Sequence, residues 1–188
     1  MDRTFRHRYE TEELTEGPGF PVSHHYYYPG ALTSGGRDGV LVRICPDEGP
    51  PWLATFAFGE FAPESPLGIF TTPDPHRLCV VAKGPAYFVS ANDPTSWEEV
   101  CVTPVLDIRP IRNSEIMVFA DFTQLVAYGA TGMKWKTKRL SWDGLKIGEV
   151  TDTSIKGEYW DFRSDRVETF VVDLATGTNR GGVEEGRP

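Results

Sequence analysis

The sequence has no long apolar run, and no signal peptide is expected at its N-terminus. No stretch approaches the roughly 18 consecutive apolar residues that a transmembrane helix needs. The N-terminus, MDRTFRHRYETEELTEGPG, has no apolar core of the kind found in signal peptides, and no N-x-[ST] glycosylation sequon occurs. We therefore expect no membrane-spanning helix, and the three absences together favour a cytoplasmic location.

Cysteine is scarce. The three cysteines are Cys45, Cys79 and Cys101, and no two of them form a C-x-x-C pair. A zinc ribbon and a thioredoxin-like redox motif are therefore both absent. An odd number of cysteines, in a chain long enough for a sizeable core, argues against a disulfide framework. We expect all three to be reduced thiols that serve as small apolar side chains.

Catalytic and cofactor-binding motifs are also missing. There is no G-x-S-x-G nucleophile turn and no D-x-[DN]-x-[DN]-G calcium loop. The segment Gly129–Gly132 lies between two strand-like runs, which predicts a hairpin turn rather than a phosphate-binding loop before a helix. The sequence accordingly assigns no catalytic residue, no metal site and no cofactor.

Positive charge is in deficit. The chain has 19 Lys+Arg against 27 Asp+Glu, which gives a net charge of −8 and a pI near 5.0. An acidic chain repels phosphate backbones and anionic lipid surfaces, so neither nucleic acid nor a membrane is expected as a partner. Another protein, or another copy of this chain, is expected instead.

The 188 residues do contain a succession of short β-like runs, rich in Val, Ile, aromatic residues and Thr and separated by Gly, Pro, Asp or Asn. Helix signals are confined to the charged segment 1–16 and to 92–99, where Asp93 and Pro94 suit the start of one helical turn. The predicted strands are 40–44, 52–58, 78–82, 86–90, 99–105, 115–120, 124–128, 133–140, 145–150, 154–160 and 168–174.

These runs define the expected domain organisation. We expect a single domain, residues 1–188, because a chain of this length fits one core. Within it, residues 1–35 are expected to be irregular and 36–177 to form the β region. Residues 178–188 are polar and glycine-rich, and they are expected to be a flexible tail.

Tryptophan and glycine recur with a period of 45 along the chain. The tryptophans are Trp52, Trp97 and Trp142, and each is preceded at the same interval by a glycine, at Gly39, Gly84 and Gly129. Residues 96–105 also align with 141–150 without a gap, as S-W-[ED]-x-[VL]-x-[VI]-x-x-V. A period near 45 with about four strands per unit is typical of propeller blades.

Two phrases carry a family resemblance. LVAYGATGMKW (125–135) and its partial echo VVDLATG (171–177) resemble the hairpins of quinoprotein-type β-propeller blades. The resemblance covers residues 78–177 and implies a fold but no activity, because the ligand-contacting motifs of those families are not recognisable here. Trp142-Asp143 and Trp160-Asp161 lie too close together in the sequence to represent one WD motif per blade.

We therefore predict an all-β fold: an antiparallel meander of about four blade-like repeats that forms a small β-propeller or a propeller-like sheet. A β-sandwich is the alternative, because it would be built from strands of the same composition and spacing.

The first candidate binding segment is His24, His25 and Tyr26, at the start of a run of three tyrosines. Adjacent side chains of a strand point to opposite faces, so the two histidines are not expected to chelate one metal ion. An aromatic edge strand that fills one end of the core, and a surface that stacks on a ligand, are the two alternatives.

The second candidate is a basic strip, defined as Lys134, Lys136 and Lys138, with Trp135 between the first two lysines. On a strand the lysines would share one face. Such a strip would fit an anionic partner or an acidic surface on another copy of the chain. The structural alternative is a solvated face, or an edge strand that its lysines protect against aggregation.

Three functions remain open. The leading expectation is a non-catalytic binding or protein–protein interaction module, because repeat-built β proteins present loops from one face as a binding surface. The second is a small hydrolase or lyase, which requires polar residues to converge at one end of the sheet. Its candidate residues are His24, His25, His76, Asp121 and Asp161. The third is a structural homo-oligomer in which strand 133–140 meets acidic surface of a neighbouring copy.

Overall fold

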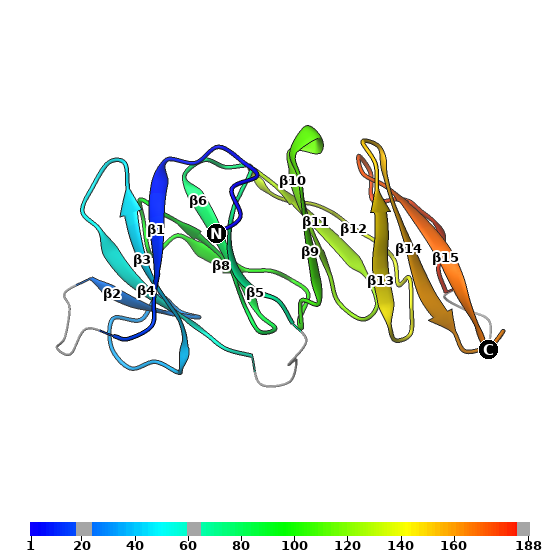
Figure 1. The fold of residues 1–188 in the computed structure, drawn as a ribbon, viewed down its shortest axis with the longest axis horizontal. Helices are drawn as coiled ribbons and strands as arrows, with labels where there is room; N and C mark the ends of the chain where they lie inside the picture. The colour runs from blue at the N-terminus through cyan, green and yellow to red at the C-terminus, as the bar shows by residue number, and fades with distance from the viewer. Residues whose placement is uncertain (18–23, 60–64, 184–188) are drawn as a thin grey trace. The chain divides into compact units, whose positions relative to one another are not determined.

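The computed structural model describes residues 1–17, 24–59 and 65–183, and it is all-β (Figure 1). In these residues sixteen strands form four sheets of four strands, and the helical structure is one 3-10 turn, η1 (Arg112–Ser114). The predicted all-β class is confirmed, and the four sheets agree in number with the prediction of about four blade-like repeats. The chain divides into two compact units, Met1–Pro104 and Val105–Pro188, and each contains two of the sheets. The expectation of a single domain stays a prediction.

Three of the sheets are antiparallel meanders, in which each strand pairs with the next one along the chain. The second sheet of unit 1 contains β5 (Leu67–Thr71), β6 (Arg77–Ala82), β7 (Ala86–Ser90) and β8 (Trp97–Glu99). Unit 2 contains β9 (Asp107–Ile111), β10 (Ile116–Ala120), β11 (Leu125–Gly129) and β12 (Gly132–Lys136), followed by β13 (Leu145–Val150), β14 (Ser154–Asp161), β15 (Arg166–Asp173) and β16 (Asn179–Gly181).

The first sheet departs from the predicted meander. Its centre is the hairpin of β3 (Gly39–Pro46) and β4 (Trp52–Ala57). The N-terminal segment supplies both outer strands: β1 (Tyr9–Leu14) pairs antiparallel with β3, and β2 (His25–Tyr28) pairs parallel with β4. The prediction that residues 1–35 are irregular was therefore wrong for the two segments that form β1 and β2, and the helix signal within 1–16 corresponds to no helix in the described residues. The sequence does not indicate β1 because its glutamates have a low strand propensity, although its Tyr9 is buried in the core.

Other predicted elements also differ. The helical turn at 92–99 is absent, because the Asp93 carboxylate accepts hydrogen bonds from the amide and hydroxyl of Thr95 in a tight turn before β8. Residues 100–105 alternate between buried and more exposed side chains but form no strand. The predicted tail begins with a strand, since β16 pairs with β15, and residues 184–188 lie outside the described part of the chain.

The 45-residue period does not superimpose strand on strand. Trp97 begins β8, whereas Trp142 lies outside any strand, shortly before β13. In the ten-residue match, residues 96–105 are a strand and the connection after it, whereas residues 141–150 are a loop and the strand after it. The similarity reflects the alternation of apolar residues in extended chain, which strands and buried connections share.

Each unit has its own apolar core, to which both of its sheets contribute. In unit 1 the core includes Val42 and Phe56 of the first sheet and Leu78 and Val89 of the second. In unit 2 the core likewise combines residues of both sheets, from Val118 and Leu125 to Ile155, Phe170 and Val172. Two four-stranded sheets that bury facing surfaces are common to adjacent propeller blades and to sandwiches.

A tryptophan hydrogen bond joins the two sheets within each unit. The indole N–H of Trp52, on β4, donates to the backbone carbonyl of Ala91, which follows β7, at 2.8 Å. The indole N–H of Trp135, on β12, donates to the carbonyl of Leu174, which follows β15, at 2.7 Å. Both bonds are buried and both span 39 residues. They set the position of one sheet against the other with a directional contact that apolar packing lacks.

Trp135→Phe should destabilise unit 2, because it leaves the buried carbonyl of Leu174 without its indole donor and opens space beside it. We expect the free energy of unfolding to fall by about 1–3 kcal/mol. Denaturant titration followed by circular dichroism measures this loss. Trp160→Phe, at a site 46% exposed, is the matched control and should change stability by less than about 0.5 kcal/mol. Equal losses in the two variants would contradict a role for the hydrogen bond.

Candidate binding surfaces

The segment that begins with His24 forms the edge strand β2, with an aromatic side directed at the core. Tyr28 is 2% exposed and stacks on Phe56 at 4.9 Å between ring centroids, and Tyr26 packs edge-on against Trp52 at 5.7 Å. The interpretation of this segment as an aromatic edge strand is therefore confirmed for Tyr26 and Tyr28. These residues are packing elements of unit 1.

The two histidines have separate environments. His24 is exposed and has a left-handed backbone (φ 85°) immediately before β2. His25 lies with its Nε2 atom 2.8 Å from the Thr55 hydroxyl and its Nδ1 atom 3.3 Å from the Tyr27 hydroxyl, and its ring stacks on Tyr27. Burial lowers the pKa of His25 below its ordinary value. Its ring nitrogens both face hydroxyl groups, an arrangement that suits a neutral structural histidine.

The basic strip lies on β12, a terminal strand of its sheet, and on the residues directly after it. Lys134, Lys136 and Lys138 are exposed, whereas Trp135 and Thr137 are buried, so the predicted alternation is present. Trp135 belongs to the core and to the sheet-joining hydrogen bond. The lysines of the strip thus lie on the exposed face, while Trp135 holds the opposite face against the core.

A cavity of about 430 Å³ lies beside Trp135 in unit 2. Apolar groups of Ile116 and Leu174 form part of its lining, and its charged lining residues are Lys134, Asp152 and Asp173. The Asp152 carboxylate accepts a hydrogen bond from the Asn113 amide at 2.9 Å. Lys134 and Trp135 are therefore the two predicted site residues that line this cavity, together with polar groups from other parts of unit 2.

The Asp173 carboxylate at this cavity has a structural role. It accepts hydrogen bonds from the amides of Ala175 and Thr176 and from the Thr176 hydroxyl. The hydrogen bonds from Thr176 hold the pKa of Asp173 below its ordinary value. Asp173 therefore caps a turn in the cavity wall, and Asp152 and Asp173 are not a pair of carboxylates without other hydrogen-bond partners.

The aspartates proposed for a hydrolase or lyase are also turn caps. Asp121 Oδ1 accepts from the amides of Thr123 and Gln124 at 2.6 and 2.9 Å. Asp161 accepts from the amides of Arg163 and Ser164, and hydrogen bonding from Ser164 holds its pKa below the ordinary value. Each carboxylate binds its own turn, as strand-end aspartates commonly do. These contacts give no support to an acid–base pair.

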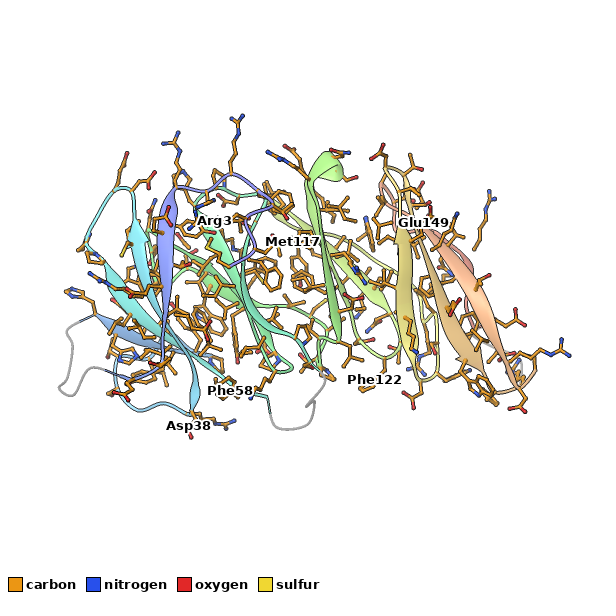
Figure 2. All side chains as sticks on the ribbon, viewed as in Figure 1. Arg3, Asp38, Phe58, Met117, Phe122 and Glu149 are labelled. Carbon is orange, nitrogen blue, oxygen red and sulfur yellow. The ribbon has the colours of Figure 1, made fainter. Side chains whose placement is uncertain are left out.

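Three exposed aromatic side chains lie at one end of unit 2. Phe122, Trp142 and Phe162 are 41, 43 and 58% exposed, and they recur at equal intervals along the sequence. The backbone amides of Leu140 and Ser141 both donate hydrogen bonds to the carbonyl of Thr123, which connects the turn that contains Phe122 to the turn that contains Trp142. The rings of Trp142 and Phe162 meet edge-on at 6.2 Å. Figure 2 shows Phe122 at the end of unit 2 opposite to Glu149.

The three turns share one construction, and we call them the aromatic turns: residues 121–124, 141–144 and 161–165. In each, a side-chain oxygen directly before the aromatic residue accepts the amide of the residue directly after it. The acceptors are Asp121, Ser141 and Asp161, at 2.6, 3.1 and 3.4 Å. Such a clamp fixes the backbone on both sides of the ring. The aromatic side chain is thereby held at the tip of a rigid turn.

Two arginines cover these rings. The guanidinium carbon of Arg139 lies 4.7 Å from the ring centroid of Trp142, and that of Arg163 lies 5.9 Å from the centroid of Phe162. Guanidinium groups stack on aromatic faces and keep their N–H donors available at the edges. The aromatic turns therefore present apolar rings and hydrogen-bond donors next to each other.

Exposed apolar surface is concentrated in the same unit. Of the ten large apolar side chains that are exposed among the described residues, seven belong to unit 2. Trp160 and Val167 face each other across β14 and β15, close to the third aromatic turn, and are 46 and 57% exposed. Tryptophan spacing does not indicate this surface, because two of its three rings are phenylalanines. An Asp or Ser followed by an aromatic residue, at 121, 141 and 161, is the pattern that marks it.

Comparison with known proteins adds no family. No family model, no curated protein and no solved structure matches this chain. Among the described residues, no helix has the length and apolar character needed to cross a membrane, and no three His, Cys, Asp or Glu side chains are grouped as metal ligands would be. The cysteines are not disulfide-bonded; Cys79 is buried, Cys45 is half-buried and Cys101 is exposed. The expected role of a small apolar side chain thus fits Cys79 best.

The environment of His25 predicts a pH dependence of stability. Because its pKa is lower in the folded state than the unfolded value of about 6.5, the unfolded chain takes up a proton first as the pH falls. The contribution of neutral His25 to stability is therefore complete well above pH 6.5 and declines below it. We expect the free energy of unfolding to fall between about pH 7 and pH 5, and to fall less in His25→Gln.

Denaturant titration of both proteins across this range measures the effect. The difference between the two curves isolates His25, because other titrating groups such as Glu99, whose pKa is raised by burial, are common to both. Parallel curves for His25→Gln and the natural protein would show that His25 has no such linkage.

Proposed function

We propose that this protein is a non-catalytic protein-binding module, and that its binding surface is formed by the aromatic turns of unit 2. The observation that carries the proposal is the presence of three exposed rings on three turns of the same clamped construction, with a guanidinium group over two of them. A cytoplasmic location, expected from the sequence, belongs to the same proposal.

Rigid exposed aromatics favour binding for an energetic reason. Apolar rings in water are unfavourable, and burying one against a partner releases about 25 cal/mol per Å² of apolar surface. Because the turns already hold the backbone, little conformational freedom is lost on binding. Trp and Arg are also among the residue types most enriched at the positions that dominate protein interfaces.

The same surface indicates the chemistry of the partner. Arg139 and Arg163 offer donors beside the rings of Trp142 and Phe162, and Lys138 is exposed next to Arg139. A protein segment with apolar side chains flanked by carboxylates would satisfy both parts of the surface. Such a partner agrees with the sequence-based expectation of a protein rather than nucleic acid.

Trp142→Ala combined with Phe162→Ala should abolish partner binding without unfolding the chain. The two rings are exposed, so stability should change by less than about 0.5 kcal/mol per site. Loss of two central interface side chains should lower affinity at least about tenfold, which corresponds to roughly 1.4 kcal/mol. Immobilised natural and variant proteins are compared as baits in a lysate of the source cells, with quantitative mass spectrometry of what each retains.

The matched control is Leu67→Ala combined with Val171→Ala, which removes two exposed apolar side chains (46 and 36% exposed) that lie outside the aromatic turns. Proteins retained by the natural chain and by this control, but depleted on the aromatic variant, are the expected result. If all three baits retain the same proteins in the same amounts, the aromatic turns are not the binding surface.

A further inference from the structure

The basic strip occupies an edge of a sheet that no described strand covers. β12 is a terminal strand, hydrogen-bonded to β11 alone in the order β12-β11-β10-β9. Lys134, Lys136 and Lys138 are exposed, and within the described part of the chain none of their ammonium groups forms an ion pair. The strip is therefore a row of positive charges along a strand edge that are not engaged in ion pairs with the described residues.

The strand with the opposite charge is β1, which we call the acidic strand. It is terminal in the order β1-β3-β4-β2, and Glu10, Glu12 and Glu13 are exposed on it. Two of these carboxylates make ion pairs, Glu10 with Arg3 at 2.8 Å and Glu12 with Arg43 at 3.7 Å. All four side chains are about half exposed or more, so these pairs contribute little and exchange readily for other partners.

Net charge follows the same division. Unit 1 has seven Lys+Arg and fourteen Asp+Glu, a net charge of −7. Unit 2 has twelve Lys+Arg and thirteen Asp+Glu, a net charge of −1. Nearly all of the excess negative charge of the chain is in the unit with the acidic strand, and the basic strip is in the other.

We propose that this chain self-associates head to tail, with β12 of one copy pairing with the acidic strand β1 of a second copy. Pairing of β12 with β12 would place lysine opposite lysine, and pairing of β1 with β1 would place glutamate opposite glutamate, and both are unfavourable. Only the mixed pair sets unlike charges across from one another. The register of β12 against β11 shifts beside Lys134, but Lys134 and Lys136 are both exposed on either side of the buried Trp135. They recur at every second residue, as Glu10 and Glu12 do, so one face of the joined edge would carry alternating partners.

The symmetry of this contact has a consequence for assembly. Each copy uses one surface to bind and a different one to be bound, which makes the contact heterologous. Such contacts form rings or open chains of copies rather than a closed two-fold dimer. This inference does not rest on the proposed function, because the aromatic turns take no part in the contact.

Sedimentation velocity of the full chain at about 0.1 M and about 1 M salt tests the association first. Screening shortens from about 10 Å to about 3 Å across this range. We expect species heavier than the 21.0 kDa monomer that grow with protein concentration at low salt and dissociate at high salt. A monomer at every concentration and salt would overturn the proposal and leave the lysines as protection of the edge against aggregation.

A charge exchange then tests the two surfaces. Lys134→Glu with Lys136→Glu makes both edges acidic, and Glu10→Lys with Glu12→Lys makes both edges basic. Each double variant alone should remain monomeric at low salt, and an equimolar mixture of the two should associate, because each edge then meets its opposite. A mixture that stays monomeric, while the natural chain associates, would place the contact elsewhere.

The two proposals fail separately. Trp142→Ala with Phe162→Ala should associate as the natural chain does, since its edge strands are unchanged. Loss of self-association in that variant would show that copies meet through the aromatic turns and would overturn the edge pairing. Circular dichroism of every variant confirms that the strands have formed before the sedimentation result is interpreted.

Discussion

A single type of contact, an indole N–H donating to a main-chain carbonyl of the facing sheet, determines how each unit is assembled. Apolar burial is non-directional, whereas a buried hydrogen bond adds a directional constraint on the relative position of the two sheets. Trp52 and Trp135 make this contact with carbonyls that follow the third strand of the next sheet. The two acceptors, Ala91 and Leu174, are separated along the chain by the same interval as the two donors. The two sheets of each unit are therefore joined by the same kind of hydrogen bond at corresponding positions.

In unit 2 this contact also determines what the turns can present. Strands β10, β12 and β14 run toward the aromatic turns. Leu174 follows β15, which runs the opposite way, so the carbonyl that accepts the Trp135 hydrogen bond lies at the other end of the sheets. Turns that are clamped by their own Asp or Ser side chains take their positions from the strands that they join. The rings are exposed to solvent, but side-chain hydrogen bonds clamp the backbone of the turns that carry them.

Much of the fold could be predicted from the sequence, because alternating apolar residues between Gly, Pro and Asp are a strong local signal. β6, β7, β11 and β13 were located to within a residue or two in this way. The acidic strand β1 and the strand β9, which contains Pro110, were missed because their residues disfavour strands and edge positions tolerate them. The alternation of Lys134, Trp135 and Lys136 could be predicted. The aromatic turns have a recurring sequence pattern, but the exposure of their rings could not be predicted from it, since exposure depends on packing between distant segments.

The arrangement of the first sheet has a consequence for the order of synthesis. Its two outer strands, β1 and β2, precede the hairpin that they flank. Both leave the ribosome before their partners exist, and β2 acquires its parallel neighbour only when β4 emerges. During that interval the nascent chain carries two strand-forming segments without a sheet. Glutamates at 10, 12 and 13 keep the first of them hydrated until β3 has been made.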